Sequence, residues 1–123
     1  MVGEPIYDKQ EQYDKIAAGL MEGEVIHAVY DMKGGGTGFL GITNKRLVFY
    51  DKSFLGKQKA MVTVPYSRIV SVASKDDSGL LARGGFFTSS MLTVRTQGAD
   101  YAFEFRGPDK AHEAYRRIVP YIM

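Results

Sequence analysis

Four lysines in the middle of the sequence border two stretches that favour loops. Lys33 precedes a glycine-rich run at 34–38, and Lys52, Lys57 and Lys59 lie in and around the next predicted loop. Each basic side chain near an anionic membrane contributes about 1 kcal/mol of attraction, so four of them would bind acidic lipid in a salt-sensitive way. The four lysines are therefore a candidate anion-binding site. The alternative is an ordinary solvated basic surface.

The distribution of charge along the chain also allows two interpretations. The net charge is +2, but residues 1–31 hold two basic and seven acidic side chains, whereas residues 32–83 hold nine basic and three acidic ones. The basic middle could bind an anionic partner, or the two segments could neutralise each other in the folded protein. With a pI of about 8.8, the basic excess is too small to predict nucleic-acid binding.

An apolar segment is the second candidate functional feature. Leu80, Leu81, Phe86 and Phe87 fall in a predicted connection between strands, where polar residues are expected. Exposed apolar patches usually mark contacts with proteins or membranes. The segment either adds a strand to a sheet or presents an interface. We predict self-association or docking of a protein partner through these four residues.

The sequence does not support catalytic or metal-binding chemistry. The chain has no cysteine, which excludes disulfides, iron–sulfur clusters and thiolate chemistry. Its two histidines, His27 and His112, stand outside any nucleophile motif, and Asp76 with Asp77 lacks the spacing of a calcium loop. The glycines at 34–38 lead into a strand and lack the lysine of a phosphate-binding loop. We therefore predict no enzyme, no metal and no cofactor.

Apolar periodicity predicts the elements that carry these residues. A period of 3.6 predicts a helix over residues 8–21, and Pro108 opens a final helix in which Pro120 disturbs the last turn. A period of two predicts seven strands between the helices, over residues 25–33, 39–43, 46–50, 60–64, 69–74, 91–96 and 101–105. Turn signals between the strands predict a meander in a mostly-β (α+β) domain.

Length and hydropathy narrow the class of protein further. A chain of 123 residues is long enough for one domain and too short for two. No apolar run approaches the roughly 20 residues of a transmembrane helix. The first residues have neither the basic start nor the apolar core of a signal peptide. We expect a cytoplasmic location, with a peripheral position at the membrane if the lysines bind lipid.

One stretch carries a resemblance to a known family. Residues 40–49 read LGITNKRLVF, two apolar strands around the turn Thr43–Arg46. This pattern resembles the hairpin of bacterial pleckstrin-homology-like (PH-like) domains, including the YokE-like group. Residues 64–72, 92–94 and 101–105 follow at positions similar to those of the family. The resemblance implies a PH-like fold, a seven-stranded bent barrel or orthogonal sandwich capped by the C-terminal helix.

The resemblance also implies roles for particular residues. It separates an N-terminal accessory helix at 1–23 from a PH-like domain at 24–123, and it implies a structural role for Arg46, through a carboxylate or a ring. In such a meander the loops after the first, third and sixth strands open at one end, which would bring the four lysines together. However, residues 38–41 read GFLG where phosphoinositide-binding relatives carry basic residues, and this departure argues against inositol-phosphate binding.

Together these observations predict a non-catalytic PH-like module for binding or assembly. The predicted partner is a protein, or further copies of the chain, bound through sheet edges and the segment with Leu80, Leu81, Phe86 and Phe87. The alternative is recruitment to an anionic lipid headgroup through Lys33, Lys52, Lys57 and Lys59. Nucleic acid is not a predicted partner.

Overall fold

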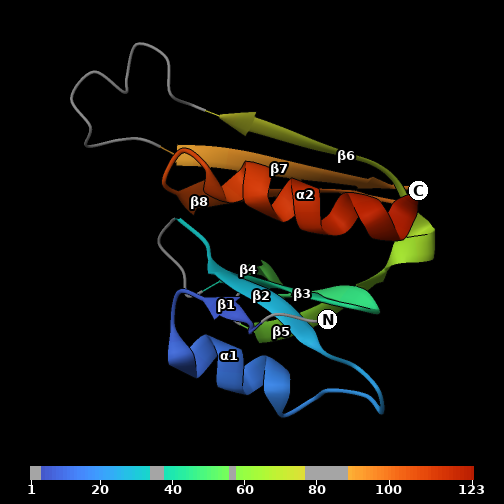
Figure 1. The fold of residues 1–123 in the computed structure, drawn as a ribbon. Coiled ribbons are helices and arrows are strands. Elements are labelled where there is room, and N and C mark those ends of the chain that lie inside the picture. Colours follow the sequence, from blue (N-terminus) through green and yellow to red (C-terminus); the bar gives the residue numbers. More distant parts are fainter. Residues whose placement is uncertain (1–3, 34–37, 56–57, 77–88) are drawn as a thin grey trace. The chain divides into compact units, whose positions relative to one another are not determined.

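The structure is a computed structural model that describes every residue except 1–3, 34–37, 56–57 and 77–88. It also leaves out the side chains of residues 51–60 and 76. The chain folds into two compact units, an N-terminal unit of residues 1–66 and a C-terminal unit of residues 67–123. Each unit has its own sheet and its own helix (Figure 1).

The N-terminal unit is a five-stranded sheet with the order β1-β2-β3-β4-β5. Strand β1 pairs with β2 in parallel, and the remaining strands form an antiparallel meander. The helix α1 lies on one face of this sheet (Figure 1). The elements are β1 (Ile6–Tyr7), α1 (Gln10–Ala17), β2 (Ile26–Asp31), β3 (Phe39–Thr43), β4 (Arg46–Leu55) and β5 (Gln58–Pro65).

The side chain of Ile16 attaches α1 to the sheet. Ile16 is 2% exposed and packs in a cluster with Val29, Phe39, Val48 and Tyr50, among others, from the three central strands. The rings of Phe39 and Tyr50 stack with their centroids 5.2 Å apart. A helix as short as α1 is marginal in water. It is stable here because the sheet buries its narrow apolar stripe.

A glycine in β3 makes room for that side chain. Gly41 is buried on the face that α1 covers, and a Cβ atom built there would collide with Cδ1 of Ile16. Its neighbour Ile42 points to the opposite face, because side chains alternate along a strand. Close packing of α1 on the sheet therefore depends on the absence of a side chain at position 41.

The C-terminal unit is a three-stranded antiparallel sheet with the order β6-β7-β8 and one long helix. The 3-10 helix η1 (Tyr66–Arg68) leads into β6 (Ile69–Asp76), which is followed by β7 (Ser89–Thr96), β8 (Asp100–Arg106) and α2 (Lys110–Ile122). Helix α2 contacts all three strands and buries Ala111, Ala114 and Ile118 completely.

Ser90 fixes the start of α2. Its hydroxyl accepts a 2.9 Å hydrogen bond from the backbone N–H of Ala111 and donates one of 2.9 Å to the carbonyl oxygen of Gly107. Gly107 has a φ of 101°, a conformation that glycine adopts without strain. A strand residue therefore caps the helix, whereas the residue at its N-cap, Asp109, makes no side-chain cap hydrogen bond.

The predicted mostly-β fold with a helix at each end is confirmed, and each of the seven predicted strands is present. The two-residue β1 was not predicted, because two residues carry no periodicity. The helix predicted over 8–21 is shorter, and α2 continues through Pro120 to Ile122. Strand pairing in the described part of the chain gives two sheets and no closed barrel.

No helix in the part of the chain that the structure describes is long and apolar enough to cross a membrane.

Replacing Gly41 by alanine should test how α1 is held. The added methyl group collides with Ile16, so we expect the free energy of unfolding to fall by about 1–3 kcal/mol, as for other overpacked cores. The change Ile16→Val removes the colliding Cδ1 atom, so the double variant should be more stable than the sum of the two single effects. Urea denaturation followed by circular dichroism measures both. Strictly additive effects would show that the collision is not the cause.

Candidate functional site

The turn of the hairpin at residues 40–49, which carries the family resemblance, forms a buried polar cluster with Glu24. Arg46 donates hydrogen bonds to both carboxylate oxygens of Glu24, from Nε at 2.8 Å and from Nη2 at 3.0 Å. The Glu24 side chain is fully buried and that of Arg46 is 16% exposed. Arg46 also donates to Oγ1 of Thr63 at 2.8 Å and to the carbonyl oxygen of Gly19 at 3.1 Å. It therefore joins the loop after α1 to strands β4 and β5.

Thr43 completes this cluster from the turn. Its hydroxyl donates to Glu24 at 2.7 Å and accepts the backbone N–H groups of Lys45 and Arg46 at 3.0 Å each. Its carbonyl oxygen accepts a 2.6 Å hydrogen bond from the hydroxyl of Tyr66, which is 8% exposed. The arrangement confirms that Arg46 pairs with a carboxylate, and it identifies Glu24 as the partner.

The electrostatics of Glu24 suit a structural ion pair. Burial by itself raises the pKa of this carboxyl, but hydrogen bonds from Arg46, the backbone N–H of Met21 and the hydroxyl of Thr43 outweigh it and lower the pKa to about 2 from an ordinary value of 4.5. Glu24 is thus charged and matched by Arg46 at neutral pH. Because its oxygens already accept several hydrogen bonds, we exclude this cluster as a ligand site.

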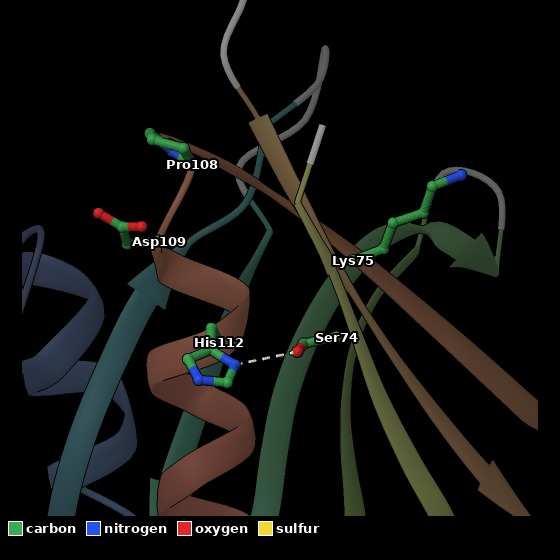
Figure 2. Close-up of a pocket in the computed structure, with 5 residues that line it drawn as sticks. All are labelled: Ser74, Lys75, Pro108, Asp109 and His112. Atoms are coloured by element: carbon green, nitrogen blue, oxygen red, sulfur yellow. Dashed lines mark hydrogen bonds between the residues drawn. The ribbon is translucent and has the colours of Figure 1, made fainter. Parts of the chain in front are cut away.

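A pocket in the C-terminal unit has polar side chains on its walls. It has a volume of about 310 Å³ and is lined by Ser74, Lys75, Pro108, Asp109 and His112, where the start of α2 meets β6. Figure 2 shows Ser74 and His112 pointing toward each other across it, whereas Lys75 extends away from them. Nδ1 of His112 lies 3.3 Å from Oγ of Ser74, and the His112 ring stacks on Tyr115.

This pocket has the residue types of a serine–histidine pair, but within the described residues it lacks a third group that orients the histidine. A histidine that activates a nucleophile is usually oriented by such a group. Within the described residues, the Asp109 carboxylate makes no hydrogen bond to His112 or to any other side chain. The ring is exposed to solvent, and it contacts Ser74 and Tyr115. The other histidine, His27, is half-buried on β2. It belongs to the N-terminal unit, whereas all the residues that line this pocket belong to the C-terminal unit.

Three of the four predicted anion-binding lysines, Lys33, Lys52 and Lys59, belong to backbone at one end of the N-terminal sheet. Lys33 follows β2, and Lys52 and Lys59 lie on the paired strands β4 and β5. Because β2 and β4 run in the same direction, both end at the same edge of the meander. The side chains of Lys52 and Lys59, and all of Lys57, lie outside the description. Convergence of the four ammonium groups therefore stays a prediction.

The predicted apolar interface lies wholly outside the described residues, as does the second half of the pair Asp76–Asp77. Leu80, Leu81, Phe86 and Phe87 belong to the segment 77–88 that connects β6 to β7. Among the residues that the structure does describe, no group of three histidine and acidic side chains is placed to hold a metal ion.

Two features of these sites have little signal in the sequence. Glu24 is one of seven acidic residues in the segment 1–31, and the single signal for its role is that it precedes an apolar strand. The contact between Ser74 and His112 joins residues 38 positions apart. No local pattern predicts such a pair. The sequence shows only that His112 lies near the start of a predicted helix.

Comparison with known proteins gives consistent results. The model of the bacterial PH domain family matches residues 20–119. The uncharacterized protein YozO of Bacillus subtilis (strain 168) is 32% identical over 91 residues, which cover 74% of this chain and 72% of YozO.

Two crystal structures have a similar fold. One is a pleckstrin homology domain from Shewanella amazonensis SB2B, with a TM-score of 0.64 and 22% identity over 94% of this chain and 98% of that one. The other is a DUF1696-family protein with a pleckstrin-homology domain from Shewanella loihica PV-4, with a TM-score of 0.64 and 20% identity over 92% of each chain.

The buried pair makes stability depend on acid in a defined pH range. The pKa of Glu24 is lowered in the folded state, so its contribution is fully present above about pH 4.5 and is lost as the pH falls toward 2. The shift corresponds to about 3 kcal/mol. Glu24→Gln should lower the free energy of unfolding by about that amount at pH 7, and the difference from wild type should shrink below pH 4.5.

Urea denaturation at pH 7, 4 and 2.5 measures this effect. The exposed neighbour Glu22, changed to Gln, is the matched control and should have little effect at any of the three pH values. A difference between wild type and Glu24→Gln that stays constant from pH 7 to 2.5 would contradict the assignment of a lowered pKa to Glu24.

Proposed function

This chain belongs to the bacterial PH domain family, and we propose that it is a non-catalytic binding and assembly module whose partner is a protein, including further copies of itself. The PH-like fold fits a binding module. A fold does not determine its ligand, so the partner must be argued from the surface.

The sheet edges carry this proposal. Within the described residues, β5 ends the first sheet and β6 ends the second, and each has a strand neighbour on one side only. Each exposes an apolar side chain, 47% of Met61 on β5 and 60% of Val70 on β6. An exposed edge offers unpaired N–H and C=O groups to a strand of another chain. Such an edge supports assembly by strand addition.

The apolar segment extends the same proposal. Leu80, Leu81, Phe86 and Phe87 belong to the connection that begins directly after β6, so we propose that they act together with this edge. We also propose that residues 1–23 are an accessory element of a PH-like domain at 24–123. The match of the family to residues 20–119 is in line with that division, and the packing of Ile16 against the sheet indicates a firm attachment.

Recruitment to anionic lipid is the second candidate function. It is favoured by the direction of the strands, since Lys33 follows β2 and the strand residues Lys52 and Lys59 lie at the same end of the N-terminal sheet, with Lys57 between them in the sequence. A hairpin that presents several ammonium groups at a membrane surface would be attracted to acidic headgroups. A glutamate at each of three hairpin positions would reverse that attraction.

Self-association through the apolar segment is tested by Phe86→Ser with Phe87→Ser. We expect the molar mass measured by multi-angle light scattering to decrease toward that of the monomer, because the variant loses apolar area from the interface. Met21→Ser with Val25→Ser removes two exposed apolar side chains of the N-terminal unit and is the matched control. An unchanged mass in a folded Phe86/Phe87 variant would remove this segment from the interface.

Lipid recruitment is tested by sedimentation with liposomes. The wild-type chain should pellet with vesicles that contain anionic lipid, less so as salt rises, and changing Lys52, Lys57 and Lys59 to Glu should abolish pelleting. Changing the exposed Lys45, Arg68 and Arg116 to Glu alters the net charge equally elsewhere. Equal loss in both triple variants would mean that net charge, and not this hairpin, attracts the protein.

A further inference from the structure

The face of the C-terminal sheet that points away from α2 has an ordered set of exposed side chains. Ser74 contacts His112 of α2, so its neighbours Ala73 and Lys75 point to the other face, and Figure 2 shows Lys75 directed away from α2. We call this other side the outer face. Strand register places residues on it in rows that run from β6 across β7 to β8.

Two of these rows have distinct chemistry. The charged row consists of Lys75, Met91 and Glu104, which are register partners on β6, β7 and β8. The small row beside it consists of Ala73, Thr93 and Ala102, which are partners in the same way. Four of these six side chains are exposed and the other two, Thr93 and Glu104, are half-buried.

The two charges of the charged row have no partner among the described residues. Lys75 and Glu104 stand on the outer strands with Met91 between them, separated by about 9.6 Å of sheet, and no ion pair joins them. Met91 is 38% exposed, and a shallow hollow of about 100 Å³ opens beside it, lined also by Ser89 and Ser90. The row thus presents a positive end, an apolar centre and a negative end.

We infer that the outer face packs against the same face of a second copy of this chain, with the charged rows antiparallel across a two-fold axis. An axis that runs parallel to the strands, between two facing sheets, sets β6 of one copy over β8 of the other. Lys75 then meets Glu104 of the second copy, Glu104 meets its Lys75, and the two Met91 side chains meet at the centre. Both charge pairs form at once, because the row is its own complement.

The small row permits the approach that this arrangement needs. Facing sheets pack about 10 Å apart and cross at about 30°. Alanine and threonine side chains can meet at that spacing without separating the sheets, and the long lysine and glutamate side chains can absorb the crossing angle. In the row beyond, Arg95 would face its own copy, but it already pairs with Asp100 at 3.3 Å in the same chain.

The size of the face sets the strength of the dimer. Three strands about 4.8 Å apart, with a rise of about 3.4 Å per residue, give it a footprint of roughly 400 Å². Stable interfaces bury about 800 Å² on each partner. The dimer is therefore weak and depends on concentration. It rests on the proposed function in so far as both involve self-association, but it uses a sheet face and neither the edges nor the segment 77–88.

Charge reversal tests this face directly. Lys75→Glu and Glu104→Lys each replace two attractive pairs by two repulsive ones, so each should weaken the dimer by about tenfold or more in sedimentation equilibrium. The double variant restores opposite charges and should return to the dissociation constant of wild type. Arg116→Glu, on the exposed side of α2, changes the net charge as Lys75→Glu does and should leave the dimer intact. Circular dichroism checks that each variant is folded.

Mixing the two single variants gives the sharpest result. A Lys75→Glu chain opposite a Glu104→Lys chain has two attractive pairs, so the mixture should form heterodimers although neither variant dimerises well alone. Native mass spectrometry with one chain labelled with 15N distinguishes the species. A wild-type chain that stays monomeric at millimolar concentration would overturn this inference and the self-association part of the proposed function. A dimer that tolerates each charge reversal, or variants that do not recombine, would overturn the face alone.

Discussion

The N-terminal unit depends on one buried ion pair, that between Glu24 and Arg46. A carboxylate without exposure is costly to bury, and here Arg46, Thr43 and the backbone at Met21 all donate hydrogen bonds to it. The pair holds together a loop, a turn and two strands that are far apart in sequence. Removing either partner leaves the other buried and unmatched, so the pair specifies the arrangement even if its net stabilisation is modest.

The same pair bears on whether the acidic segment 1–31 and the basic segment 32–83 neutralise each other in the folded protein. Glu24 from the acidic segment and Arg46 from the basic middle neutralise each other. Lys9 and Asp31, in contrast, are 3.6 Å apart and both belong to the acidic segment. Among the described residues, the pair Glu24–Arg46 is thus one position at which the acidic and the basic segment neutralise each other.

The sequence predicted the scaffold better than the sites. The alternating strands and the turn at Thr43–Arg46 were found because they are local patterns of two to ten residues. The partner of Arg46 was not found, since Glu24 lies 22 positions away and only the folded sheet brings the two together. Strand β1 was overlooked because its two residues join the sheet through pairing with Ala28 and Val29, and not through a pattern of their own. The face with Lys75, Met91 and Glu104 appears only when the register of three strands is known.

Tyr66 fixes the last residue of the N-terminal unit to the turn at Thr43–Arg46. It is the last residue of the N-terminal unit, and its hydroxyl is bonded to the backbone of Thr43 within the turn that also holds Glu24 and Arg46. A pull on the chain at this residue would therefore reach the N-terminal unit at two places at once, through the backbone of β5 and through the hydrogen bond to the turn beside the buried ion pair.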